Sequence, residues 1–170
     1  TFFPLIGFLV IFFIRQNQKQ TNHWVALQTS LLAFGVSLFE LALFDSTTSE
    51  PQLVVDVPWV NLAGLPIHFF LAVDGLGLMM VLLTTFLTPL TILSTWESVQ
   101  DRVKEFMLFF LLLETSLIGV FLAFDLVLFF IFWEFTLVPM YFLIGVWGGE
   151  RRLYATMKFF LYTMAGSTLL

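Results

Sequence analysis

Long uninterrupted runs of apolar residues constrain the fold of this chain more than any other feature. Six runs occupy most of its 170 residues, and none alternates polar and apolar positions in a way that would give a water-facing side. Hydrophobic residues make up 59% of the chain and charged residues 11%, against about 45 to 50% and about 25% in ordinary globular domains. A water-soluble fold has no place to bury so much apolar surface, so the sequence indicates a membrane protein.

Each run is predicted to form a helix that crosses the bilayer, because a backbone in lipid must satisfy its own hydrogen bonds. A crossing takes about 20 apolar residues, given a hydrocarbon core about 30 Å thick and a rise of about 1.5 Å per residue. The predicted spans are residues 2–14, 24–44, 74–95, 106–124, 125–147 and 153 onward. The expected fold class is all-α, a polytopic membrane helix bundle. The first residue is not methionine and the last lies within an apolar run, so we expect the N-terminal part of a longer protein.

One connection, residues 45–73, is much longer than the others and is predicted to contain a small β-hairpin. Its segments 53–57 and 67–73 are rich in valine and aromatic residues, which favour strands. Between them, residues 61–66 include Asn61, Gly64 and Pro66, which are typical of a turn. The hairpin is expected to lie on one face of the membrane.

The positions of lysine and arginine predict the orientation of the chain, because short loops rich in these residues stay on the cytoplasmic or matrix side. The loops after the first, third and fifth spans carry such residues, and the loops after the second and fourth carry none. The basic residues are Arg15, Lys19, Arg102, Lys104, Arg151 and Arg152. The N-terminus and the hairpin are therefore expected on the outer side. We expect three regions: 1–73 with the first two helices and the hairpin, 74–105 with the third helix and its loop, and 106–170 with the last three helices.

Several classes of site are excluded or disfavoured by composition. The chain has no cysteine, which excludes disulfides, thiolate zinc sites and cysteine-ligated iron–sulfur clusters in this segment. Its two histidines, His23 and His68, are both predicted in loops without a histidine partner for haem, so we expect no metal or cofactor site here. No basic run indicates binding to nucleic acid.

Three charged residues fall inside predicted spans and are the candidate functional residues. Glu114 lies near the middle of the fourth span, Glu134 near the middle of the fifth, and Lys158 early in the sixth. A charged group at the centre of a bilayer costs about 2.5 to 3.5 kcal/mol on insertion scales, so it is a functional candidate by default. A dry environment favours a neutral carboxyl group and a nearby ammonium favours a carboxylate, so moving a lysine can load or unload a proton. The sequence therefore predicts a proton path through Glu134, Lys158 and Glu114.

Structural interpretations of the same residues remain open. A buried glutamate can stay protonated and simply bond a neighbouring helix, and Lys158 can extend its side chain to the basic face. Pro139, one turn after Glu134, is predicted to bend its helix and admit water, or to form an ordinary kink. Asp74 and Asp125 stand where helices begin, so they are interpreted as N-caps.

Five motifs from residue 72 onward point to a known family. They are AVDGL at 72–76, GVFLAFD at 119–125, FWEFTLVPMY at 132–141, WGG at 147–149 and KFFLYT at 158–163. Together they resemble the antiporter-like membrane subunits of respiratory complex I (NADH:quinone oxidoreductase), of the NuoM/NdhD type. The most specific part of the resemblance is the tryptophan, glutamate and proline of the third motif. The resemblance runs from about residue 72 to the end, and the first 70 residues match in hydropathy alone.

The resemblance implies a subunit of about fourteen helices with inverted repeats, of which residues 106–170 begin the first. It implies proton translocation driven by quinone reduction elsewhere in the complex, with Glu134 at the place of a key channel glutamate whose lysine partner lies beyond this chain. It further implies no redox chemistry in this chain, since NAD, FMN, iron–sulfur clusters and quinone belong to other subunits. The expected partners are the other membrane subunits of the complex, including neighbouring antiporter-like ones, and the lipid bilayer.

Two other functions remain compatible with these residues. One is a subunit of an Mrp-type sodium/proton antiporter, which shares the fold and the motif. The other is a non-transporting membrane scaffold, in which the buried charges only hold helices together. The expected location is a bacterial inner membrane, with the mitochondrial inner membrane and the thylakoid left open, as are the coupling ion and the quinone type.

Overall fold

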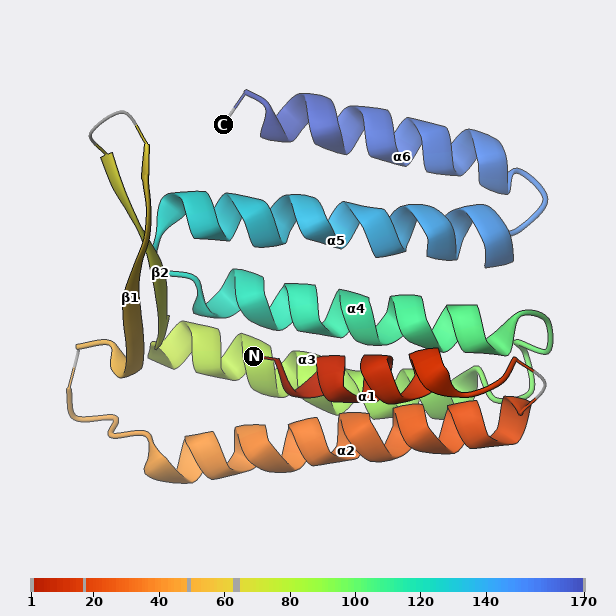
Figure 1. Cartoon of the computed structure of the whole chain (residues 1–170), viewed down its shortest axis with the longest axis horizontal. Coiled ribbons are helices and arrows are strands. Elements are labelled where there is room, and N and C mark those ends of the chain that lie inside the picture. Colours follow the sequence, from red (N-terminus) through yellow and green to blue (C-terminus); the bar gives the residue numbers. More distant parts are fainter. Residues whose placement is uncertain (1, 17, 49, 63–64, 170) are drawn as a thin grey trace.

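The computed structural model describes residues 2–16, 18–48, 50–62 and 65–169, and it leaves the side chains of residues 61, 62, 65 and 66 undescribed. These residues form six helices that run side by side and a two-stranded hairpin that crosses one end of them (Figure 1). The helices are α1 (Phe3–Phe13), α2 (Lys19–Leu43), α3 (Gly75–Ser94), α4 (Val103–Leu122), α5 (Leu126–Trp147) and α6 (Arg152–Ser167). The strands are β1 (Gln52–Leu62) and β2 (Leu65–Val73).

Helix α4 is the centre of the bundle. It contacts α1, α2, α3 and α5, whereas α6 packs mainly against α5 at the edge (Figure 1). One apolar cluster joins α4 to α1, α2 and α3 through residues such as Met107, Leu111, Ile11 and Ile92, each fully buried. Neighbouring helices therefore cover much of α4, while α5 and α6 keep much exposed apolar surface.

Four helices, α2 to α5, are long and apolar enough to cross a membrane. This confirms the mainly helical fold class and the middle four of the predicted spans. The first and last helices are shorter, with 11 residues in α1 and 16 in α6. Both still run alongside the long helices in the bundle (Figure 1).

Two helices begin earlier than hydropathy predicts, because polar residues extend them at one end. Helix α2 begins at Lys19 and α4 at Val103. The prediction that His23 lies in a loop is therefore wrong. Its ring is buried in the first turns of α2, 4.7 Å from the ring of Trp96, and Nδ1 lies 3.0 Å from the carbonyl oxygen of Lys19. A helix end can bury a polar ring against an aromatic neighbour, which a hydropathy average does not register.

The predicted hairpin is present and is longer than expected. Its antiparallel strands pair Asp56 with Phe70 and Val57 with Phe69. They extend into the segment predicted as a turn, and residues 63 and 64 lie outside the described part of the chain. His68 belongs to β2 rather than to a loop, so that prediction is also wrong, and its Nδ1 lies 2.7 Å from Oδ1 of Asp56.

The hairpin is attached to the ends of the central helices by main-chain bonds. The N–H of Phe124, after α4, donates to the carbonyl oxygen of Phe70 (2.9 Å), and Leu71 forms a bridge with Ala123. The hairpin thus marks one end of the bundle.

In the loop before β1, the hydroxyl and N–H of Thr47 donate hydrogen bonds to the carboxylate of Asp45. These bonds lower the pKa of that exposed carboxyl group.

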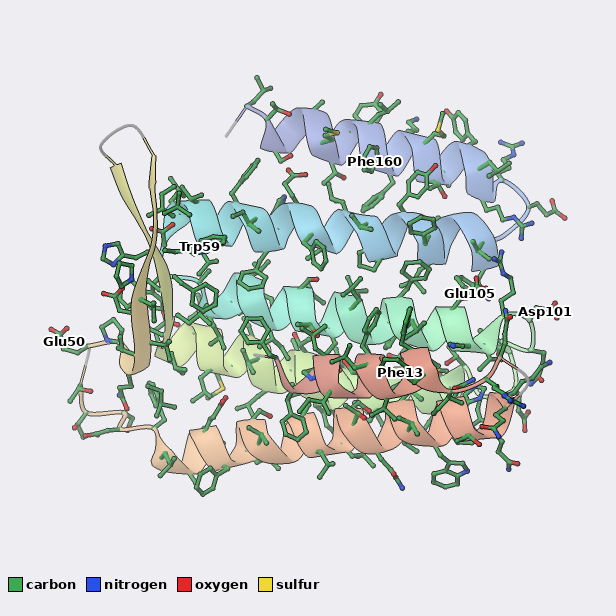
Figure 2. The ribbon with its side chains drawn as sticks, viewed as in Figure 1. Phe13, Glu50, Trp59, Asp101, Glu105 and Phe160 are labelled. Atoms are coloured by element: carbon green, nitrogen blue, oxygen red, sulfur yellow. The ribbon has the colours of Figure 1, made fainter. Side chains whose placement is uncertain are left out.

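The basic loops lie at the opposite end from the hairpin. Figure 2 shows Asp101, in the loop before α4, and Glu105, in the first turn of α4, at that end. Glu50 lies at the other end, beside the hairpin. Lys104 donates to the carbonyl oxygens of Phe12 (2.8 Å) and Ile14 (2.6 Å), so it satisfies the carbonyls that α1 leaves free at its C-terminus. The charge alternation along the sequence therefore corresponds to two distinct ends of the molecule.

Asp74 and Asp125 are N-caps, as predicted. The carboxylate of Asp74 accepts from the N–H of Gly77 (2.7 Å), and that of Asp125 accepts from the N–H groups of Val127 (2.9 Å) and Leu128 (3.0 Å). Each cap satisfies donors that the first turn of a helix leaves free. These two acids need no other explanation.

The close approach of α4 and α5 generates a stability prediction. A Cβ added at Gly119 would overlap the ring of Phe132 on α5, whereas one added at Gly35 on α2 would meet no atom within 4 Å. We expect Gly119→Ala to lower the free energy of unfolding of the full-length subunit by about 1 to 3 kcal/mol, because an overpacked contact forces one helix to shift. Gly35→Ala is the matched control and is expected to be neutral or stabilising by up to about 1 kcal/mol. Denaturation in mixed detergent micelles measures both, and equal stability of the two variants would contradict the close packing.

Candidate functional site

The three charged residues predicted within the membrane occupy three separate places. Glu114 is buried in α4. Glu134 lies on α5 and faces α6, and Lys158 is exposed on α6. No hydrogen bond or ion pair joins any two of them in the described part of the chain. The structure therefore gives two acidic sites rather than one continuous cluster.

Glu114 is enclosed and lacks partners. Its side chain is 2% exposed, and neither carboxyl oxygen has a hydrogen-bond partner among the described residues. The hydroxyl of Thr88 on α3 faces this carboxyl group, but it donates to the carbonyl oxygen of Thr84 at 2.9 Å. A buried carboxylate without donors is costly, so this group requires either a bound proton or a water molecule.

Glu134 is half-buried and has a hydroxyl partner. Ser167, near the end of α6, donates a hydrogen bond to Oε1 of Glu134. Glu134 also lines an apolar groove of about 400 Å³ between α5 and α6, which includes Phe130, Phe160 and Met164. A second groove of about 310 Å³ continues along the same two helices and is lined by Ser167. The carboxyl group thus has a hydroxyl partner and also lines a groove.

Lys158 does not reach either acid. Its ammonium nitrogen lies 5.6 Å from the ring centre of Tyr154 and 5.7 Å from that of Tyr162, which stand one turn to either side on α6. It is also 3.5 Å from the Tyr154 hydroxyl. A cation held between two aromatic rings is stabilised by their π faces. In the described chain Lys158 therefore belongs to an exposed face of α6.

Each acid has a buried proline nearby. Pro139 lies inside α5 about one turn from Glu134, and α5 continues through it to Trp147. Pro89, which the sequence analysis did not single out, lies inside α3 and directly follows Thr88. Because proline has no N–H, Pro89 leaves the carbonyl of Thr85 without its helical donor, and Pro139 does the same to Phe135. Each proline thus leaves one main-chain carbonyl without its helical donor, next to Glu134 in the sequence of α5 and one turn before Thr88 on α3.

Sequence reasoning missed other polar residues that the fold brings together. Ser167 is 33 residues from Glu134, so only the register of α5 against α6 reveals their contact. The hydroxyl oxygens of Ser37 on α2 and Thr85 on α3 are hydrogen-bonded at 2.8 Å. Both residues line a small cavity, and Glu40 of α2 lines it as well. Of these residues, Glu40 could have been identified from the sequence, because it is an acid inside the predicted span 24–44. The described residues contain no group of three or more side chains suited to hold a metal ion.

Comparisons with known proteins agree with the motifs. Residues 123–170, which include Glu134, Pro139 and Lys158, match the family described as NADH:quinone oxidoreductase/Mrp antiporter, transmembrane region. The chain is 46% identical over 174 residues to NADH-quinone oxidoreductase subunit M of Rhodobacter capsulatus, covering 100% of this chain and 33% of that protein. It is 41% identical over 168 residues to NADH-ubiquinone oxidoreductase chain 4 of Mycosarcoma maydis, covering 96% of this chain and 34% of the relative.

A solved structure shares the fold at low sequence identity. The Mrp complex from Dietzia sp. DQ12-45-1b contains a chain that matches 96% of this one with a TM-score of 0.75 and 18% identity, over 18% of its own length. The present chain spans about a third of the length of the curated relatives it matches. The four long apolar helices and these similarities make it an integral membrane protein. The chain belongs to the family of antiporter-like membrane subunits represented in NADH:quinone oxidoreductase and Mrp antiporter complexes.

Proposed function

We propose that this chain is the N-terminal part of a proton-translocating membrane subunit of an NADH:quinone oxidoreductase. The observation that carries the proposal is Glu134, an acid within a long apolar helix and inside the segment that matches the family, which has a hydroxyl partner and lines a groove. The relatives at 40 to 46% identity are subunits of NADH-quinone or NADH-ubiquinone oxidoreductases. Redox chemistry then takes place in other subunits of the complex, and this chain contributes proton transfer.

Glu134 holds or passes a proton within the membrane on this proposal. A hydroxyl can donate to a carboxylate and can accept from a carboxylic acid, so Ser167 can bond Glu134 in both protonation states by rotating its hydrogen. The groove beside Glu134 offers space for water or for a basic side chain from the rest of the subunit. An approaching ammonium favours the carboxylate, and its withdrawal favours the acid. Lys158 and Glu114 are secondary polar groups in proton transfer through the subunit, and Pro139 is the position at which water enters beside Glu134.

The hairpin end of the bundle faces the outer side on the same proposal, and a bacterial inner membrane is the location that we favour. Support comes from the separation of the two ends, with the basic loops opposite the hairpin. The first and last helices then complete six spans of a subunit with about fourteen helices. The other membrane subunits of the complex and the surrounding lipid are the partners.

The orientation can be tested by labelling, because this chain has no cysteine of its own. Thr48 and Ser98 are exposed and lie in loops at opposite ends of the bundle. We expect Thr48→Cys to react with a membrane-impermeant maleimide added to intact cells, and Ser98→Cys to react only after the membrane is opened. The two variants control for each other, and labelling of Ser98→Cys in intact cells would reverse the proposed orientation.

The role of Glu134 is tested by Glu134→Gln in the full-length subunit within its complex. Glutamine keeps the shape of the side chain and its hydrogen bonding but cannot titrate, so we expect NADH-driven proton pumping to fall by about tenfold or more. Pumping is measured in proteoliposomes by dye quenching, with complex assembly checked by native electrophoresis. Glu97→Gln, at an exposed position before α4, is the control that should pump normally.

Unchanged pumping in an assembled Glu134→Gln complex would rule out the proposed role. If Glu134→Leu also assembled and pumped normally, the chain would be a scaffold in which the acid has no transport role. The structural similarity to an Mrp complex supports a sodium/proton antiporter subunit as the second candidate function. Co-purification of the tagged subunit with flavin and iron–sulfur subunits distinguishes the oxidoreductase from the antiporter.

A further inference from the structure

A small cavity between α1, α2, α3 and α4 has the size and lining of a water site. Its volume is about 20 Å³, and a cavity needs roughly 10 to 15 Å³ to hold one water molecule. Three polar side chains line it, those of Ser37 and Glu40 from α2 and Thr85 from α3, and the rest of the lining is apolar. A buried water needs about two to four polar partners, which these side chains supply.

The hydroxyls of Ser37 and Thr85 can reorient because they have more acceptors than hydrogens. Their oxygens are 2.8 Å apart, and each is also 2.8 Å from a main-chain carbonyl oxygen, that of Phe34 for Ser37 and that of Val81 for Thr85. Two hydrogens serve three contacts, so at any time one contact lacks a hydrogen. Pro89 adds the free carbonyl of Thr85 as a further acceptor nearby. Rotation of hydroxyls between acceptors is what proton relay along hydrogen bonds requires.

The cavity lies between Glu40 and Glu114 along the bundle. Ile118, which lines it, is one turn from Glu114 on α4, and Thr85 is one turn from Thr88, which faces Glu114. One turn is about 5.4 Å. Helices α2 and α4 run toward the hairpin and α3 runs away from it. Ile118 on α4 and Thr85 on α3 therefore place the cavity nearer the hairpin than Glu114. Glu40, in the last turn of α2, is nearer still.

The opposite direction from Glu114 is closed by apolar packing. Leu111 and Met107 follow on the same helix toward the basic loops, and Ile92 follows Thr88 on α3; each is fully buried. Water in an apolar plug of this kind would lack hydrogen-bond partners. Along α3 and α4 the polar connection therefore leads from Glu114 toward the hairpin and not toward the basic loops.

We propose that the cavity binds a water molecule which, with the Ser37 and Thr85 hydroxyls, connects Glu40 to Glu114 as a proton half-path open to the hairpin end. The Glu40 acid gives its proton to this water, which releases another to the hydroxyls. They pass one on to the hydroxyl of Thr88, one turn along α3 and facing Glu114, which gives its own proton to the Glu114 carboxylate. The water and each hydroxyl gain one proton and lose one, so one proton moves from Glu40 to Glu114. This path is separate from the groove at Glu134 and rests on the proposed proton-conducting function.

The test measures proton exchange at Glu114 rather than pumping. In the intact complex with the full-length subunit, the C=O stretch of protonated Glu114 is the infrared band that Glu114→Gln removes. After transfer to D2O this band shifts as deuterium replaces the carboxyl proton of Glu114. The time course of the shift gives the exchange rate. We expect Thr85→Val and Glu40→Gln each to slow this exchange by about tenfold, because each removes one relay group. Thr91→Val is the matched control, since Thr91 is on the same helix but donates only to its own helix, at the carbonyl of Leu87.

Three results would overturn the half-path: wild-type exchange in Thr85→Val, equal slowing in Thr91→Val, or the absence of any protonated band that depends on Glu114. Ser37→Ala repeats the test from α2 if the Thr85→Val subunit does not assemble. The proposed function fails separately. Normal pumping by Glu134→Gln would reject it even if exchange at Glu114 slowed as expected, and unaltered exchange at Glu114 would leave the role of Glu134 intact.

Discussion

Polar groups inside a bilayer must find their partners within the protein, and this constraint decides how the bundle is built. Most hydroxyls of the long helices meet it locally. Thr84, Thr88 and Thr91 of α3 each donate to the carbonyl of the residue four positions earlier. Such bonds hide a polar group without help from another helix. The exceptions therefore stand out. They are the Ser37 and Thr85 pair, the Ser167 bond to Glu134, the unpartnered Glu114, and Asn22 and His23 in the first turns of α2, which have buried atoms without a partner among the described residues.

The two acids differ because their helices occupy different places in the bundle. Helix α4 is surrounded by four others, so Glu114 is closed off from solvent and lipid. Helix α5 has α4 on one side and α6 on another, and much of its remaining surface is exposed in the described chain, so Glu134 keeps an open groove. The contact of Gly119 with the Phe132 ring holds α4 against α5, and Phe132 is two residues from Glu134 in sequence. The packing that fixes the spacing of these helices therefore also fixes the position of Glu134.

The sequence predicted the parts of the structure that depend on local composition. The long apolar runs predicted α2 to α5, the valine-rich loop predicted the hairpin, and the positions of Asp74 and Asp125 predicted their capping role. It failed where tertiary contacts decide the outcome. His23 lies in α2 with its ring packed on Trp96, and the Ser167 bond to Glu134 depends on how α6 is aligned against α5. No local pattern contains that alignment, so hydropathy and motifs found the acids but not their partners.

A half-path that opens to one end cannot by itself move protons across a membrane. Glu114 would exchange its proton with the hairpin end alone, because Leu111 and Met107 close the other direction. Net transport then requires that another route reach the opposite side, and the groove of Glu134 lies across α4 and α5 from this site. The apolar interface between those two helices would hold the two acids apart at rest. A small separation of α4 from α5 that admitted water would connect them, whereas tight packing keeps the two ends of the membrane insulated. The same interface that stabilises the bundle would thus prevent a proton leak.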